Sequence, residues 1–288
     1  GSFDSPEIMK VISDITEFGK ELCEKAENKS ISEVLLVTDE HTRASMSLSF
    51  ALNCGLRLEL PTQLHMMGTP IDILRLSDLD DCDLGRYKFI VFADAFKIPS
   101  MLREKIIGKI RKGTVVVHHY VPGILAPDFD PENVRRTCGF SISEFSPDEI
   151  TVKDEGYPEV CGNAFDAPGT LDFPTVEIVP EDGISVLSRY SDGRIKTAKR
   201  TFRDFESVLC TYPSLTAHDL RQLAEESGVR MYAPCGVTVY GDNRAMGFFS
   251  STAEEFDTVL PNGKALHIAL EEKDMRVEKL TKRSIIEN

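Results

Sequence analysis

Apolar residues in the first half of the chain follow two alternating spacings, one typical of helices and the other of buried strands. Residues 8–25 carry apolar side chains at helical spacing, which predicts an amphipathic helix. Residues 34–37 form a continuous apolar run that stops at Asp39, and such a run predicts a strand buried on both faces. The same reasoning predicts strands at 71–76, 89–93 and 115–117, and helices from the end of the first strand to about Met67 and at 99–112. This alternation predicts a parallel sheet with helices on both faces.

The pattern weakens between residues 122 and 174, where Gly, Pro, Asp and Asn recur and no element is predicted. We place an irregular insertion at about 141–180, and long irregular segments are often functional or partner-facing. Beyond it the predicted elements are a hairpin of strands 184–190 and 196–202 about an Asp-Gly turn, a strand at 206–211, a helix at 220–227 and a strand at 229–232. A capping box, Thr216-Ala217-His218-Asp219, opens the predicted helix.

Alternating apolar and polar residues continue to the end of the chain. Strands are predicted at 237–240 and 245–249, and a turn at 261–264 divides residues 256–286 into a small antiparallel extension. The first two residues, Gly1-Ser2, resemble a cloning scar. The predicted organisation is therefore a scar at 1–2, an α/β domain at 3–255 with the insertion inside it, and a C-terminal β extension at 256–288.

Composition and charge exclude several classes of partner. The chain has 288 residues, of which 41% are hydrophobic and 28% charged, as in ordinary globular proteins. Its net charge of −14 argues against nucleic acid, because Lys and Arg must neutralise phosphates there. Seven scattered cysteines without a C-x-x-C motif favour reduced thiols and a cytoplasmic location. No stretch approaches the roughly 18 apolar residues that span a membrane.

The fourth predicted strand ends in a loop that could hold a catalytic nucleophile. After the run of valines the chain continues as His118-His119-Tyr120 and reaches a glycine at Gly123. Folds of the class I glutamine amidotransferase type carry a cysteine elbow in such a loop, and here the cysteine is missing. The third strand also ends without Cys or Ser. We therefore predict no catalytic residue at either position.

Polar residues at the strand ends are the remaining candidates for a site. Six of them could line a crevice, because ligands bind at the carboxyl ends of strands in open α/β sheets: Asp39, Glu40, Asp94, His118, His119 and Tyr120. Neighbouring residues of a strand point to opposite faces, so the two histidines cannot both bind one metal. Acidic strand ends are also commonly solvated caps, and glycoside hydrolysis needs two carboxylates at about 5 to 9 Å, which spacing alone does not establish. We predict no metal and no cofactor.

Several runs, strung in order between residues 8 and 265, together resemble one known family. The segments 61–79, 87–96, 113–123, 132–140, 186–193 and 223–232 are similar to successive landmarks of the trimerisation domain of family-42 β-galactosidases. This resemblance implies a flavodoxin-like, amidotransferase-like open parallel sheet with antiparallel additions and a small C-terminal β extension. In that family a catalytic barrel comes first, and the domain builds the homotrimer and walls off the active site of a neighbouring subunit.

The chain differs from the family in lacking the barrel, which needs about 250 residues. The resemblance therefore implies a non-catalytic oligomerisation domain of a β-galactosidase-like glycoside hydrolase. Such a domain would assemble as a homo-oligomer, a trimer by resemblance, and would follow an upstream barrel if the chain is an excised piece. The alternative is a stand-alone hydrolase that uses Asp94 and His119, or a ligand-binding module of the same fold. We expect the segment 154–173 and the strand ends around Tyr120 and Phe96 to be covered in the assembly.

Overall fold

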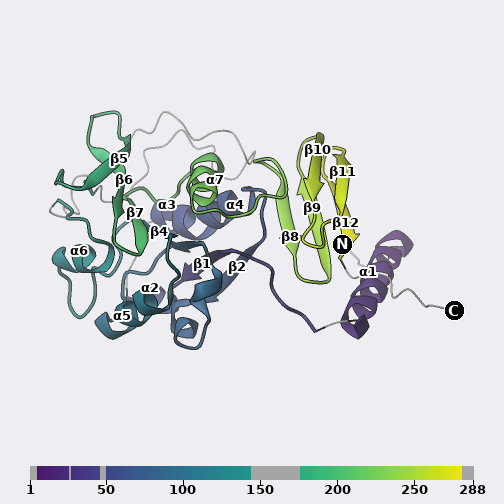
Figure 1. The fold of residues 1–288 in the computed structure, drawn as a ribbon, viewed down its shortest axis with the longest axis horizontal. Helices are drawn as coiled ribbons and strands as arrows, with labels where there is room; N and C mark the ends of the chain where they lie inside the picture. Colours follow the sequence, from purple (N-terminus) through teal and green to yellow (C-terminus); the bar gives the residue numbers. More distant parts are fainter. Residues whose placement is uncertain (1–4, 26, 46–49, 144–175, 281–288) are drawn as a thin grey trace.

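The computed structural model describes residues 5–25, 27–45, 50–143 and 176–280. Most of the predicted insertion at 141–180 and the predicted contact segment at 154–173 lie outside these residues, as does the Gly1-Ser2 pair. The described chain forms a larger α/β part and a smaller antiparallel part, and helix α1 (Pro6–Lys25) lies beside the smaller one (Figure 1).

A seven-stranded sheet forms the centre of the larger part, as the alternation of strand and helix patterns predicts. Its strands in spatial order are β2 (Ile71–Arg75), β1 (Val34–Thr38), β3 (Phe89–Phe92), β4 (Thr114–His119), β7 (Phe205–Cys210), β6 (Ile195–Thr201) and β5 (Ile184–Arg189). The first five are parallel, whereas β6 and β5 are antiparallel additions at one edge. The mixed α/β class is therefore confirmed.

Helices cover both faces of this sheet, because alternate strand residues point to opposite sides. One face packs against α3 (Phe50–Cys54), the π-helix η1 (Gly55–Glu59), α4 (Leu60–His65), α6 (Glu132–Cys138) and α7 (Ala217–Glu226). The other face packs against the 3₁₀ helices η2 (Leu76–Asp80) and η3 (Leu84–Arg86) and helix α5 (Ser100–Lys109). The short helix α2 (Glu40–Ser45) follows β1 directly. Two separate apolar cores result.

The smaller part is built from two antiparallel sheets around a third core. One sheet has the order β12 (Asp274–Lys279), β9 (Ala245–Ser250), β8 (Thr238–Gly241), and the other pairs β10 (Glu254–Val259) with β11 (Ala265–Leu270). Phe248 and Ile268, both fully buried, belong to the core between them. The domain boundary predicted at residues 255 and 256 falls inside β10, and β9, which precedes it, pairs with β12, which follows it.

Two local predictions differ from the structure. The strand predicted at 229–232 is wrong, because the N–H groups of Tyr232 and Ala233 both donate to the Gly68 carbonyl in a loop, at 2.8 and 3.1 Å, rather than to a neighbouring strand. Gly68 has a φ of 85°, and a Cβ there would collide with the Ala233 carbonyl. Helix α6 lies in the region where no element is predicted. No helix of the described residues has the length and apolar character needed to cross a membrane.

Candidate functional site

The carboxyl ends of β1 and β3 lie side by side where the order of the strands reverses. From β1 the chain first adds β2 on one side and later adds β3 on the other. Open α/β sheets bind their ligands in the crevice at such a switch point. Asp39 follows β1 and Asp94 follows β3, so the structure brings these two predicted residues together.

A buried ion pair fills the switch point. The Asp94 carboxylate accepts hydrogen bonds from the Asp39 backbone N–H at 2.8 Å and from Nε of Arg57 at 2.9 Å. Arg57 comes from the π-helix η1, whose irregular turn lies over this end of the sheet. Burial raises the pKa of Asp94, while the Asp39 N–H and the Arg57 guanidinium act in the opposite direction. Asp94 is 1% exposed, so it serves as the counter-ion of Arg57 and holds the start of the β1–α2 loop.

The carboxylate of Asp39 has a separate structural task. Its two oxygens accept bonds from the His41 backbone N–H at 2.9 Å and from the Thr42 hydroxyl at 2.6 Å. Thr42 Oγ1 in turn accepts the N–H of Phe96 at 3.2 Å, which joins α2 to the loop after β3. Asp39 therefore caps the first turn of α2, a role that short acidic side chains commonly take.

Glu40 does not join this cluster, although it is next to Asp39 in the chain. Its side chain is exposed and accepts a 2.6 Å hydrogen bond from the Ser77 hydroxyl, which lowers its pKa. The two buried carboxylates and the exposed one therefore have different environments. None of the three has the exposed, paired arrangement that glycoside hydrolysis requires.

His118 and His119 end β4 and point to opposite faces of the sheet, as the strand geometry predicts. The His118 ring stacks on Phe92 in the next strand, with ring centroids 5.0 Å apart and planes 12° apart. Within the described residues, neither ring nitrogen of His119 makes a hydrogen bond, and the same holds for Nδ1 of His118. Burial lowers the pKa of both residues to about 3, so both rings are neutral at ordinary pH. These histidines are packing groups of the two cores.

Tyr120 occupies the turn after β4, at which the sequence predicts no catalytic residue. Its φ is 63°, in the left-handed region that a residue with a bulky side chain rarely adopts. The backbone N–H donates to the Cys210 carbonyl at 2.7 Å, and the ring packs at a tilt against Phe96, 5.8 Å away. The turn therefore has a positive φ, and the side chain at it is a fully buried aromatic ring.

The burial of Tyr120 and Phe96 corrects the expectation that these two side chains are exposed, whereas the predicted contact with a partner stays a prediction. Both were expected to lie at exposed strand ends and to be covered by a partner, yet both are 0% exposed. Their rings turn inward onto the core beneath α4 and α6, because the loops after β3 and β4 fold back over the sheet. These residues are covered by their own chain.

Sequence reasoning missed the cation of this cluster. Arg57 stands between two leucines in a stretch whose neighbours are largely apolar, and a lone cation in such a stretch is the signal that an acidic partner is buried nearby. In the described part of the chain, no group of three or more His, Cys, Asp or Glu side chains is placed to hold a metal ion. The six described cysteines are free thiols.

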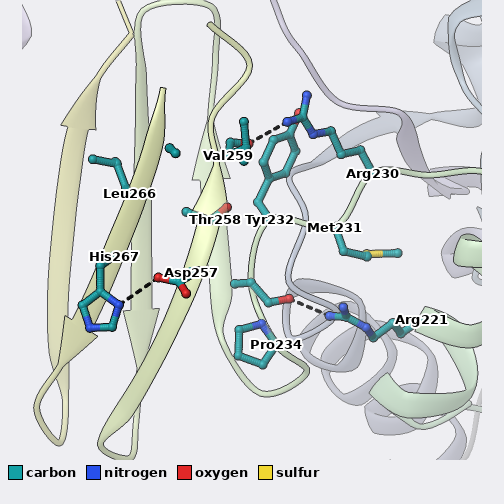
Figure 2. A pocket seen from close by; sticks show the side chains of 12 residues that line it. Arg221, Arg230, Met231, Tyr232, Pro234, Asp257, Thr258, Val259, Leu266 and His267 are labelled. Carbon is teal, nitrogen blue, oxygen red and sulfur yellow. Dashed lines mark hydrogen bonds and ion pairs between the residues drawn. The ribbon is translucent and has the colours of Figure 1, made fainter. Parts of the chain in front are cut away.

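A pocket of about 660 Å³ lies elsewhere, between the connecting segment after α7 and the β10–β11 hairpin (Figure 2). None of the six strand-end residues contributes to it. Its walls are Arg221, Arg230, Met231, Tyr232, Ala233 and Pro234 on one side and residues 257–259 and 265–267 on the other. No sequence motif predicts this pocket, because it arises where the two parts of the molecule meet.

No protein-family model and no curated protein matches the chain. Solved β-galactosidase structures do match it in fold. The enzyme from the Antarctic haloarchaeon Halorubrum lacusprofundi is 16% identical with a TM-score of 0.59, over 90% of this chain and 41% of its own.

Two further β-galactosidases show the same relation. The cold-adapted enzyme from Rahnella sp. R3 is 15% identical, with a TM-score of 0.62 over 96% of this chain and 45% of its own. A catalytic mutant of a family-42 β-galactosidase from G. stearothermophilus is 13% identical, with a TM-score of 0.63 over 96% of this chain and 44% of its own. The chain thus shares its fold with these proteins and spans less than half of their length.

Proposed function

We propose that the chain is a non-catalytic accessory module of a glycosidase-type protein, built on a flavodoxin-like, amidotransferase-like sheet. The order of its parallel strands, β2-β1-β3-β4-β7, is the 2-1-3-4-5 order of doubly wound flavodoxin-like sheets. The shared fold with part of several β-galactosidases supports the glycosidase setting. An analogy of fold leaves function to be argued from the site.

The observation that carries the proposal is that the polar side chains at the strand ends, Glu40 apart, are buried and held by contacts within the chain. Asp94 is neutralised by Arg57, both histidines lie among apolar side chains, and Tyr120 fills the elbow. Acid–base or nucleophilic catalysis requires a group within hydrogen-bond reach of substrate. None of these side chains is accessible to a substrate. The module would act through its surfaces, by assembling subunits and shaping the mouth of a neighbouring barrel.

Helix α1 supplies a surface suited to that role. Its last turns contact the antiparallel part, where Lys279 pairs with Glu21 and lies over the Phe18 ring, 5.3 Å from the centroid. Its first turns instead expose a row of apolar side chains, each between 41% and 64% exposed: Ile8, Met9, Val11, Ile12 and Ile15. A surface helix normally buries such a stripe. We propose that an identical subunit covers it, or the barrel where the chain is part of a longer protein.

Activity assays on the purified chain test the proposal. We expect no release of p-nitrophenol from a p-nitrophenyl β-galactoside and no release of ammonia from glutamine above the rate measured without protein. Turnover that survives repurification and disappears in the Asp94→Asn or His119→Ala variant would establish the alternative, a stand-alone hydrolase. Turnover unchanged in both variants would indicate a contaminating enzyme.

A further inference from the structure

The pocket between the two parts of the molecule has an unpaired strand edge as one wall. Strand β10 lies between β11 and the connecting segment 230–234, and among the described strands only β11 pairs with it (Figure 2). The connecting segment forms the other wall without joining the sheet. The N–H groups of Tyr232 and Ala233 are directed to Gly68, away from β10.

The register of the hairpin shows which backbone groups of β10 face the pocket. The Leu260 N–H donates to the Lys264 carbonyl at 2.9 Å, which makes these two residues a hydrogen-bonded pair. Such pairs alternate along an antiparallel ladder, so Thr258 bonds to Leu266 whereas Asp257 and Val259 direct their N–H and C=O groups away from β11. Arg230 Nη2 donates to the Val259 carbonyl at 2.7 Å, which fits this assignment.

In the described part of the chain, the N–H groups of Asp257 and Val259 have no hydrogen-bond acceptor. A row of unpaired backbone groups on an edge strand is a template for another strand. Recognition proteins use such edges to bind extended peptides, with backbone bonds for affinity and neighbouring side chains for specificity.

Arg230 gives the pocket its charge preference. Its guanidinium lies 5.0 Å from the centroid of the Tyr232 ring, and it forms no ion pair with a carboxylate of the described residues. Asp257, an acid of the hairpin that also lines the pocket, is paired with His267 at 2.9 Å. Arg221, at the other end of the pocket, is already bound by Glu225. A stacked arginine with free donors suits a carboxylate ligand.

We infer that this pocket binds an extended peptide segment carrying an acidic side chain, which adds as a strand to the free edge of β10. The peptide backbone bonds to the N–H groups of Asp257 and Val259, and its carboxylate meets Arg230. Apolar side chains on the other face of the peptide pack against Met231 and Pro234. This surface is independent of α1 and of the strand-end cluster.

A phage-displayed library of random heptapeptides, selected on the wild-type chain, tests the inference. We expect enriched peptides that contain Asp or Glu, lack proline at their centre, and slow amide hydrogen exchange at Asp257 and Val259 when bound. No enrichment above an empty-resin selection would overturn the inference. Enriched peptides that leave these two amides unprotected would also overturn it, since they would bind a different surface.

Two matched substitutions separate strand addition from side-chain or small-anion binding. Val259→Pro removes one pocket-facing N–H and no bond to β11, because proline is tolerated on an edge strand where its nitrogen faces outward. We expect it to weaken peptide binding at least about tenfold, while the control Val259→Ala keeps the wild-type affinity. Equal binding by both variants overturns strand addition.

Arg230→Glu provides a second measurement if the proline variant is unstable. We expect this substitution to lower the affinity of the chain for the acidic peptides by about tenfold or more. Their binding should also no longer depend on salt concentration. Circular dichroism and a thermal melt check that each variant is folded. Acidic peptides that bind Arg230→Glu as well as wild type would show that the pocket does not select a carboxylate.

Discussion

Two adjacent histidines bury neutral imidazole rings on opposite faces of one strand. Burial lowers the pKa of His118 and His119 to about 3, from an ordinary value of 6.5. In the unfolded chain both rings take up protons below pH 6.5, while the folded chain does not take them up until about pH 3. The stability present above pH 6.5 is therefore lost as the pH falls through this window.

We predict that acid destabilises the chain steeply through these rings. Between pH 6 and pH 4 each histidine should contribute a slope of about 1.4 kcal/mol per pH unit to the free energy of unfolding. Urea titrations at several pH values measure it. His119→Leu removes one imidazole, so its free energy of unfolding should fall with pH less steeply than that of wild type, by about 1.4 kcal/mol per pH unit. Parallel curves for the two proteins would contradict the burial of His119.

A second prediction at the residue scale concerns the Arg57–Asp94 pair. Arg57→Met leaves the Asp94 carboxylate buried without its cation, and we expect a loss of roughly 3 kcal/mol of stability. In an Asp94→Asn background the same change should cost less than about 1 kcal/mol, because no buried charge remains to be compensated. A double-mutant cycle by chemical denaturation measures the coupling. Additive costs would show that the two side chains do not interact.

Only some contacts of the strand-end cluster could be predicted from the sequence. Asp39 and Asp94 both follow predicted parallel strands, so their place at one edge of the sheet is predictable from the sequence, and the adjacency of β1 and β3 then brings them into contact. The bond from Arg57 is not predictable, since it depends on a π-helical turn that shifts the arginine toward Asp94. The burial of Tyr120 depends on a loop conformation with positive φ, for which the residue type gives no signal.

At the scale of elements, the start of helix α7 is set by the capping box that its sequence contains. The Thr216 hydroxyl accepts the Asp219 N–H at 3.2 Å, as the capping box predicts. A second cap comes from outside the helix, because Gln63 on α4 accepts the Ala217 N–H at 2.7 Å. The start of α7 is therefore fixed both by its own sequence and by a helix residue 154 positions earlier in the chain.

We predict that Thr216→Ala costs about 1 kcal/mol of stability, which is typical for the loss of one cap. Thr216→Ser keeps the hydroxyl and should remain close to wild type. Thermal melts of the three proteins give the comparison. If the alanine variant matches the serine variant, the Gln63 contact alone holds the start of the helix.

Elements were predictable where local pattern and burial agree. The continuous apolar runs of β1 and β3 are buried on both faces as expected. Residues 229–232 have a strand-like composition, but a strand exists only where a neighbour pairs with it, and here the segment bonds to Gly68. The spacing of apolar residues in α1 predicts the helix correctly, yet it does not reveal that its first turns are exposed.

At the scale of the whole molecule, most of the polar groups that could catalyse a reaction are buried, whereas the surfaces that could bind a partner are exposed. The strand ends, where an α/β enzyme would work, are closed by internal contacts. The exposed apolar row of α1 lies at the antiparallel end of the molecule, and the free edge of β10 lines the pocket between the two parts. Function is therefore expected at surfaces that partners cover.

We predict a concentration-dependent homo-oligomer in solution. Closed symmetry requires complementary patches on every subunit, and the apolar row of α1 is the patch that we expect to be buried. Ile12→Glu places a charge in this row at a position that is 44% exposed, so the fold should persist while assembly is lost. Ser13→Glu adds the same charge on the polar side of the helix and should assemble like wild type. Light scattering over a concentration series measures the mass of each protein. A monomeric wild type at every concentration, or equal masses for the two glutamate variants, would exclude α1 as the contact between identical subunits.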